Sequence, residues 1–328
     1  MSYTIPLPAG GARDTLDVID PFSSMVQRFL RREGLAAYEP ETAATLLSLF
    51  DMQTGPFTYY DVGSNIGLYS HLCAALFPDA DVHAFEPTPE IAAISRSIAE
   101  ANGLDVQVVE VAVSDGSGTA DLHLSQTSDA SNSLVEGFKE SSGSVTVQRI
   151  RLDDHRARTG RPPTVLKIDV ETHEPEVLAG AMEIIANDRP YVIIEVLRRR
   201  GTDQGAAIQA AFDGLGYTYY PLTAIPTWKS KTKVKGSGTV ERDWLFAPEP
   251  LPDDFADRWV TWQSRLAACT SSRNSRPPIG GAAVAAYRRG GPVELLSSCR
   301  RFVGEDLVPT LRRRFARSKP NGDPSLDE

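Results

Sequence analysis

Cysteine is scarce in this sequence. The 328 residues contain three cysteines, Cys73, Cys269 and Cys299, which are odd in number and far apart. Such a set supplies neither a disulfide framework nor the paired spacing of a zinc site, so it favours reduced thiols in a cytoplasm. No complete set of metal ligands is evident elsewhere in the chain, and no metal site is predicted.

Long apolar runs and an excess of basic charge are also missing. No segment approaches the roughly 18 consecutive apolar residues from which a membrane span is predicted. The start, MSYTIPLPAG, lacks a basic region followed by an apolar one, so no signal peptide is expected. The net charge of −9 argues against nucleic-acid binding, which usually needs a basic balance. The composition, with 41% hydrophobic and 23% charged residues, is that of a soluble globular protein.

The chain divides into three parts that differ in composition and in the spacing of apolar residues. Residues 1–54 form a Pro/Gly-rich arm followed by two segments of helical spacing, the first with a serine pair that suits an N-cap and the second with Pro40 at its start. Residues 55–250 alternate strand-like and helix-like segments. Residues 251–328 form an extension that is partly linker. Its positions 273–328 hold eleven Lys/Arg and six Asp/Glu, so they carry +5 and the remainder carries −14.

The middle part predicts a doubly wound α/β domain. The strand-like segments FTYYDV, DVHAFE, TVLKIDV and YVIIEVL are separated by helix-like ones, including one over 174–187. This alternation implies a mostly parallel sheet with helices on both faces, and the apolar runs suit strands buried on both faces. A last segment, RDWLFA, suggests a hairpin that adds an antiparallel edge strand.

A glycine-containing loop, DVGSNIG, follows the first strand. A dinucleotide-binding loop would have glycine at Asn65, and a P-loop would have a lysine that is absent here. The loop still presents backbone N–H groups at a helix N-terminus, which suit a carboxylate, and Asp61 suits an amine. S-adenosylmethionine (SAM) carries both groups at its amino-acid end. The alternative is a tight turn with no ligand. The predicted contacts are Asp61, Gly63, Ser64, Asn65 and Gly67.

Two further segments extend this candidate cofactor site. Glu86 ends the second strand about 20 residues after the glycine loop, where a carboxylate accepts hydrogen bonds from both ribose hydroxyls. Pro87 follows it, and the alternative role of Glu86 is a helix-start acid. After the third strand, the small residues of VAVSD leave space for adenine, with contacts predicted from Ala112, Ser114 and Asp115; a simple turn explains this segment equally well.

The segment LKIDVETHEPEVLAG places acids at the end of another buried strand. Ligands of doubly wound sheets bind at such strand ends, so Asp169 and Glu171 are predicted to belong to the site. His173 is balanced between a capping residue and a general base. Lys167, within the strand, needs a partner. Glu176 is interpreted as a first-turn acid that complements the helix dipole.

Seven segments occur in the order found in one known family. DVGSNIGLYS, FEPTPE, VAVSD, SDASNSL, V-x-x-I-x-L-D-D, LKIDVETHEPEVLAG and IIEV, over about residues 56–200, resemble the FkbM family of SAM-dependent methyltransferases. The resemblance implies a class I methyltransferase (Rossmann-like) fold and O-methylation of a sugar, glycan or polyketide-type hydroxyl. One departure is Thr172, where the family usually has glycine, a residue that permits an unusual backbone angle.

O-methylation of a hydroxyl is helped by one general base. A hydroxyl that attacks the SAM methyl group is helped by a side chain that accepts its proton. The candidate bases are His173, Asp169, Glu171 and Glu195.

The polar stretch 125–144 predicts a lid in which Asn132 and Ser133 contact substrate, with a surface hairpin loop as the alternative.

Two other functions and the partners of the protein stay open. An NAD-dependent sugar-modifying enzyme is disfavoured by Asn65, and a catalytically inactive scaffold is disfavoured by the retained Asp61, Glu86 and Asp169. The expected partner is a small-molecule or glycan hydroxyl substrate. Residues 292–315 place apolar residues at helical spacing among arginines. This pattern favours a helix packed on the domain or on a second copy of it, in a homodimer, over peripheral contact with an anionic membrane.

Overall fold

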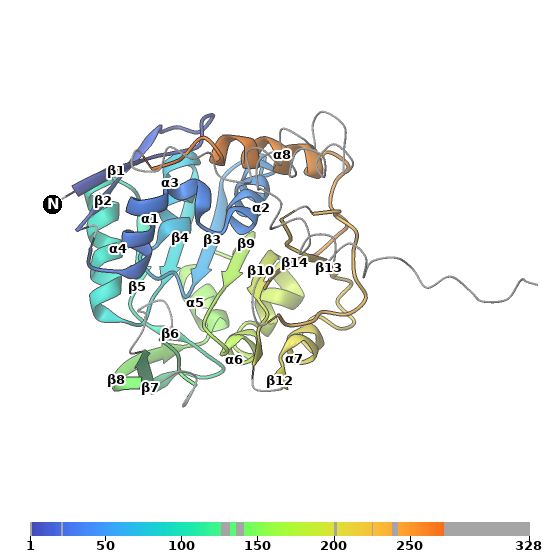
Figure 1. Cartoon of the computed structure of the whole chain (residues 1–328). Helices are drawn as coiled ribbons and strands as arrows, with labels where there is room; N and C mark the ends of the chain where they lie inside the picture. The colour runs from blue at the N-terminus through green and yellow to red at the C-terminus, as the bar shows by residue number, and fades with distance from the viewer. Residues whose placement is uncertain are drawn as a thin grey trace, which may run out of the picture.

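The centre of the molecule is a seven-stranded sheet (Figure 1). The computed structural model describes residues 2–20, 22–125, 132–135, 141–199, 202–224, 226–237 and 242–271. The strand order is β13-β14-β10-β9-β3-β4-β5. Five adjacent strands run parallel, as the alternation of strands and helices predicts. They are β3 (Phe57–Val62), β4 (Ala80–Phe85), β5 (Val106–Val109), β9 (Val165–Ile168) and β10 (Tyr191–Glu195).

One side of the sheet ends in the expected antiparallel hairpin. β14 (Asp243–Ala247) pairs antiparallel with β10 and with β13 (Thr218–Pro221). The antiparallel strand therefore lies one place inside the edge, and β13 itself occupies the edge, because β14 returns between β13 and β10. This mixed α/β architecture confirms the predicted fold class.

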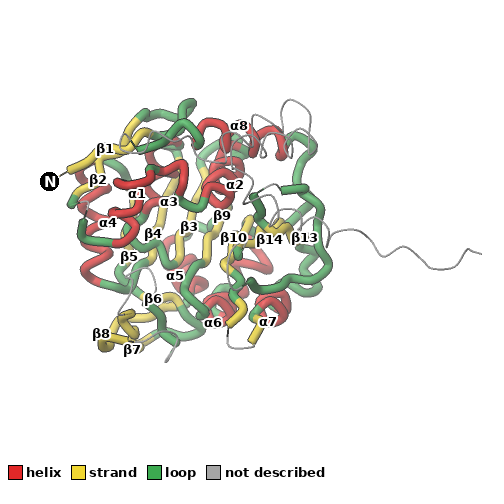
Figure 2. Tube along the Cα trace, in the orientation of Figure 1, coloured by secondary structure: helices red, strands yellow, loops and turns green. Residues whose placement is uncertain are grey.

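Helices cover both faces of the sheet (Figure 2). One face packs against α2 (Pro40–Asp51), α3 (Leu68–Leu76), α4 (Pro89–Asn102) and α8 (Phe255–Leu266). The other packs against α5 (Leu152–Thr159), α6 (Glu174–Ala179) and α7 (Gly205–Ala210). Every residue of β3 is buried. The apolar runs thus correspond to strands covered on both faces, as predicted.

The N-terminal arm contains a hairpin that its Pro/Gly content did not indicate. β1 (Ser2–Pro6) pairs antiparallel with β2 (Thr15–Ile19). Ile5, Leu16 and Val18 are buried at alternating positions, and this two-residue period was the available signal. α1 (Met25–Glu33) begins after Ser24, whose side chain forms a capping box with Gln27, so the predicted serine cap is confirmed. A 3₁₀ turn, η1 (Leu35–Ala37), leads to α2.

The predicted helix over 174–187 is wrong in its length. α6 ends at Ala179, and a separate π-helical turn, η3 (Ile184–Asp188), follows. The chain packs tightly at Gly180, where a Cβ atom would lie 2.0 Å from the Ser114 carbonyl oxygen. A small sheet, β6 (Ala112–Val113), β8 (Ser141–Ile150) and β7 (Gly118–Ser125), lies beside this region, and β11 (Arg198–Arg199) pairs with β12 (Thr202–Asp203).

α8, beyond the domain boundary predicted near residue 250, packs on α2. Trp259 Nε1 donates to Thr45 Oγ1 at 3.2 Å, and Arg258 forms a 2.8 Å ion pair with Asp51. The domain boundaries themselves remain predictions. The segment 292–315 lies outside the described residues. No helix in the described part of the chain has the length and apolarity needed to cross a membrane.

Candidate functional site

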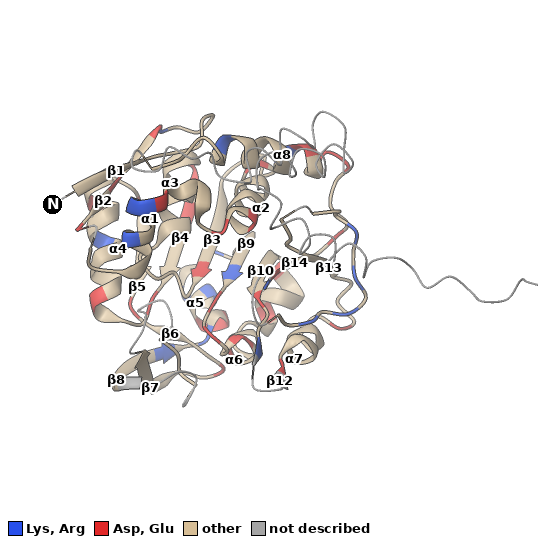
Figure 3. Cartoon of the chain, in the orientation of Figure 1, with Lys and Arg blue, Asp and Glu red and all other residues tan. Residues whose placement is uncertain are grey.

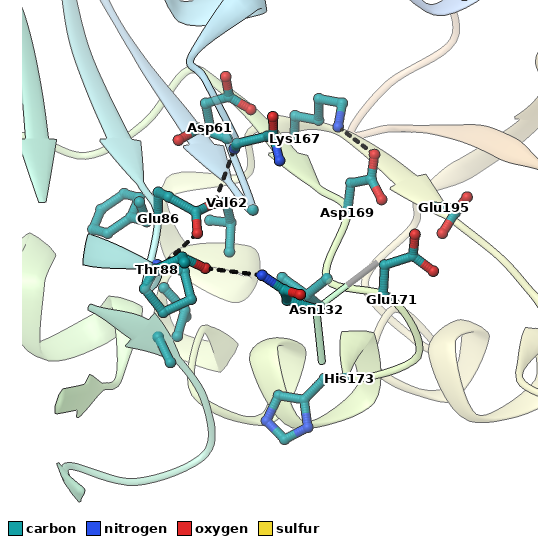
Figure 4. Close-up of a pocket in the computed structure, with 18 of the residues that line it drawn as sticks. Asp61, Val62, Glu86, Thr88, Asn132, Lys167, Asp169, Glu171, His173 and Glu195 are labelled. Carbon is teal, nitrogen blue, oxygen red and sulfur yellow. Dashed lines mark hydrogen bonds and ion pairs between the residues drawn. The ribbon is translucent and has the colours of Figure 1, made fainter. Parts of the chain in front are cut away.

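A cavity of about 290 Å³ opens where the parallel strands end (Figure 4). After β3 the chain continues to β4 on one side, while β9 lies on the other, so the order of strands reverses here. Doubly wound sheets bind ligands at such a switch point. An acidic residue near the end of β3 and a basic residue near the end of β9 colour the ribbon red and blue at this edge of the sheet (Figure 3). The position of the cavity therefore agrees with the site expected from the sequence.

The two loop glycines are required by packing. Gly63 has φ 76°, and a Cβ atom there would lie 1.9 Å from the Asp169 carbonyl oxygen. Gly67, at the N-terminus of α3, has φ 74°, and its Cβ atom would lie 2.4 Å from Ser95 Oγ. Glycine tolerates both the positive φ and the close approach. The tight turn is thus real, and it presses the loop against the end of β9.

Several polar atoms of the cavity wall lack a partner. Asp61 is fully buried, and its Oδ2 accepts a hydrogen bond from Ser70 Oγ at 2.7 Å. Asp61 Oδ1, Ser64 Oγ and Asn65 Oδ1 find no hydrogen-bond partner in the described structure. Burial raises the pKa of Asp61, while Lys167 and Ser70 act against that rise. Buried polar atoms without partners are costly. These atoms therefore fit a polar ligand that donates hydrogen bonds.

Glu86 is held in a fixed orientation beside this loop. Its carboxylate accepts the backbone N–H groups of Asn65 at 3.0 Å and Thr88 at 2.8 Å. Each carboxylate oxygen can accept a further hydrogen bond. Pro87 and Ala112 also line the cavity. Glu86, Pro87 and Ala112 therefore share one cavity, and their contact with a ribose and an adenine stays a prediction.

Three residues of the predicted cofactor site are not among those that line the cavity. They are Gly67, Ser114 and Asp115. The Ser114 hydroxyl lies 3.0 Å from His173 Nε2, and the Asp115 carboxylate lies 3.4 Å from an Arg149 nitrogen. Their role at adenine stays a prediction.

The strand-end acids gather on one side of the cavity. The carboxylates of Asp169, Glu171 and Glu195 lie near one another in Figure 4. Lys167 Nζ donates to Asp169 Oδ2 at 2.8 Å, which supplies the partner that Lys167 needs. Arg242 pairs with Glu195 Oε1 at 2.8 Å. Burial raises the pKa of Glu195 well above its usual value, and the charges of Asp169 and Glu171 raise it further.

His173 stands apart from this acid group. It lines the cavity, but its ring contacts Ser114 through Nε2 and lies 3.6 Å from Glu176 through Nδ1. Burial lowers its pKa, although the charge of Glu176 opposes this effect. In Figure 4 the ring lies below the acids rather than among them. His173 occupies the N-cap position of α6, but its side chain makes no capping hydrogen bond there. The choice between a capping residue and a general base therefore stays open.

Among the cavity-lining residues that sequence reasoning missed are Glu39, Tyr69 and Arg242. Glu39 lies at the N-cap of α2, Tyr69 in α3 donates to it at 2.7 Å, and Arg242 precedes β14. Burial raises the pKa of Glu39 to about 7, and the charges of Asp243 and Asp169 contribute to that rise. A charged residue just before the Pro40 helix start was the available signal for Glu39.

The predicted lid residues reach the cavity. Asn132 Nδ2 donates to Thr88 Oγ1 at 3.3 Å, and Ser133 Oγ donates to the Glu171 carbonyl oxygen at 2.8 Å. Both residues line the cavity. The rest of the predicted lid includes 126–131 and 136–140, which lie outside the described residues. Contact of Asn132 and Ser133 with substrate stays a prediction.

The turn that carries Glu171 has an unusual backbone. Glu171 has φ 54° and Thr172 has φ 81°. The buried Glu174 carboxyl group accepts the backbone N–H groups of Val170 at 3.1 Å and Thr172 at 3.3 Å. A β-branched residue at positive φ is strained. The expectation that position 172 favours glycine is therefore matched by its backbone, and Glu174 helps to hold the turn.

We expect Thr172→Gly to stabilise the protein by about 1 kcal/mol. The change relieves strain of about 1–3 kcal/mol, from which the entropic cost of glycine, about 0.5–1 kcal/mol, is subtracted. The measurement is the free energy of unfolding in urea. Thr227→Gly is the control, because Thr227 is exposed and is not among the described residues with positive φ. Equal losses of stability in the two variants would show that Thr172 is unstrained.

Three curated relatives match part of the chain. The hexuronic acid methyltransferase AglP of Haloferax volcanii is 31% identical over 138 residues, covering 42% of this chain and 54% of the relative. The 2-O-methyltransferase NoeI of Sinorhizobium fredii is 30% identical, covering 39% and 59%. The 31-O-demethyl-FK506 methyltransferase FkbM of Streptomyces tacrolimicus is 28% identical, covering 37% and 58%. The chain thus spans somewhat over half the length of these relatives.

A solved structure and a family model complete the comparison. The crystal structure of methyltransferase FkbM from Methylobacillus flagellatus KT has a TM-score of 0.41 and 13% identity, covering 62% of this chain and 47% of that one. The model of the methyltransferase FkbM domain matches residues 61–219, a range that starts at Asp61 and includes Glu86, Asp169 and Glu195. Residues 61–219 of the chain therefore match the methyltransferase FkbM domain, and the chain is similar to curated methyltransferases over much the same region.

Proposed function

We propose that this protein is a SAM-dependent O-methyltransferase that acts on a hydroxyl of a sugar, glycan or polyketide-type natural product. One observation carries the proposal. A single cavity joins the unpartnered Asp61 and loop atoms, the fixed Glu86 carboxylate and a group of acids at the ends of β9 and β10. The relatives named as methyltransferases of a hexuronic acid, of a 2-O position and of a 31-O position support the O-methyl transfer.

The residues present fit SAM. Asp61 and the unpartnered atoms of Ser64 and Asn65 would hold the amino-acid end, and the loop offers backbone N–H groups to its carboxylate. Glu86 would accept the ribose hydroxyls, and Ala112 would leave space for the base. When bound, SAM supplies an electrophilic methyl group on a sulfonium.

The protein's own part in the reaction is positioning and proton acceptance. Asp169 is the best-placed base of the four candidates, because its backbone touches the cofactor loop at Gly63 and its carboxylate enters the cavity. Lys167 fixes the orientation of that carboxylate. Holding the hydroxyl in line with the methyl group contributes through orientation, and the carboxylate contributes by taking the proton.

Replacement of Glu86 tests the cofactor assignment. We expect Glu86→Ala to weaken SAM binding by roughly 1.5–3 kcal/mol, the size of a hydrogen bond to a charged acceptor. Isothermal calorimetry of the folded variant gives the value. Glu100→Ala is the control, because it removes an exposed acid of α4 that does not line the cavity. Unchanged SAM affinity in folded Glu86→Ala would reject the ribose assignment.

A ligand comparison tests the cofactor class. We expect SAM and S-adenosylhomocysteine to raise the melting temperature of the unmodified protein, and NAD to leave it unchanged. Stabilisation by NAD alone would favour the sugar-modifying alternative. A cytoplasmic location, a homodimer and membrane contact through 292–315 stand beside this proposal as further predictions.

A further inference from the structure

The side of the cavity away from Glu86 is acidic. Four acidic residues line it, namely Glu39, Asp169, Glu171 and Glu195. Among the described residues that line the cavity, the lysines and arginines are Lys167 and Arg242. Each of these two is already in a 2.8 Å ion pair, with Asp169 and Glu195 respectively. On this side, an anionic substrate group would therefore face acidic residues. The two cations described here are already paired with acids.

Two of these residues come from outside the family-matched range 61–219. Glu39 lies in the N-terminal segment, and Arg242 is the residue that precedes β14. Glu39 has φ 39°, a left-handed conformation that is uncommon for a residue with a side chain. Tyr69 OH donates to its carboxylate at 2.7 Å, which orients it at the cavity wall. The acidic side is therefore partly built by segments that lie outside the family-matched range.

Glu195 gives a separate indication that a ligand belongs here. The residue is 4% exposed, and one of its oxygens, Oε1, pairs with Arg242. Its other oxygen, Oε2, has no hydrogen-bond partner in the described part of the chain. A buried carboxyl oxygen at a cavity wall is satisfied when a ligand donates a hydrogen bond to it.

We infer that Glu39 and Glu195 form an acceptor subsite for a hydroxyl-rich sugar unit that is neutral or carries an amine, and that this subsite rejects a unit with a carboxylate or phosphate. The inference rests on the proposed function, because it places the methyl acceptor in this part of the cavity. Hydroxyl and ammonium groups donate to both carboxylates. A carboxylate on the substrate would lie on the acidic side of the cavity and would be repelled by the acids there that are ionised.

The state of Glu39 agrees with this choice. Burial raises its pKa to about 7, and the nearby Asp243 and Asp169 add to the rise, while Lys167 and Tyr69 oppose it. The carboxyl group is thus ionised in only part of the population at neutral pH. A bound ammonium group stabilises the ionised form, and a bound carboxylate opposes it.

Binding of three sugars that share one ring tests the subsite without the true acceptor. Glucosamine, methyl glucoside and glucuronate are titrated into the full-length protein saturated with S-adenosylhomocysteine, and their dissociation constants are measured by calorimetry. We expect glucuronate to bind at least about tenfold more weakly than glucosamine, with methyl glucoside between them. Equal or tighter binding of glucuronate, or binding of none of the three, overturns the inference.

Variants that remove one charge test whether Glu39 and Glu195 cause the preference for glucosamine over glucuronate. Glu39→Gln and Glu195→Gln keep the side-chain size and should each reduce the preference for glucosamine over glucuronate to about threefold or less. Glu100→Gln removes one exposed acid of α4 and should keep the full preference. A preference that survives in both cavity variants also overturns the inference. Failure of the proposed function is recognised separately, because the protein would then not bind S-adenosylhomocysteine.

Discussion

We expect Asp169→Asn to lower turnover about 10²–10⁴-fold, the usual contribution of one positioned base. The asparagine keeps the shape of the side chain but does not accept the substrate proton. SAM affinity should change little, because the predicted cofactor contacts come from Asp61, the glycine loop and Glu86. The assay measures transfer of a labelled methyl group from SAM to an acceptor, and calorimetry measures SAM affinity in the same preparation.

The matched comparison is His173→Gln. The His173 ring contacts Ser114 and Glu176 and lies apart from the strand-end acids, so we expect a loss of turnover of less than about tenfold. A large loss in His173→Gln together with a small one in Asp169→Asn would move the base to the histidine. Near-normal turnover in both variants would point to Glu195, whose Oε2 is unpartnered in the described structure.

The second large effect is expected from Gly63→Ala. A Cβ atom at this position would lie 1.9 Å from the Asp169 carbonyl oxygen, and the backbone has φ 76°. The left-handed conformation and the overpacking together should cost about 2–5 kcal/mol in the free energy of unfolding. Because the loop must move away from the end of β9, SAM binding should be lost as well.

Gly55→Ala is the control for that experiment. Nothing lies within 4 Å of a Cβ atom built at Gly55, and its φ is not among the positive values. Its unfolding free energy should change by less than about 0.5 kcal/mol, as is usual for substitutions that make no special contact. Wild-type stability and SAM affinity in Gly63→Ala would show that the loop does not press on β9.

The local parts of the site were readable along the chain. Buried parallel strands appear as apolar runs, and the Gly63 loop appears as a pattern because its φ and its close approach both demand glycine. The position of Glu86 at a strand end follows from the spacing of one βαβ unit. The strained turn at Thr172 was also indicated, by a departure from the FkbM pattern. These features depend on neighbours within a few residues or on the regular alternation of strands and helices.

The sequence by itself determined the fold class, the glycine loop and the set of acids at strand ends. Only the tertiary structure decided which of these side chains share the cavity. Arg242 reaches Glu195 because β14 returns antiparallel beside β10 and sets Asp243 opposite Glu195. Glu39 enters from an N-terminal helix start far from β9 along the chain, and His173 turns toward Ser114 instead of the acids. The direction of a side chain depends on the packing of distant segments, and the local spacing of residues does not predict that packing.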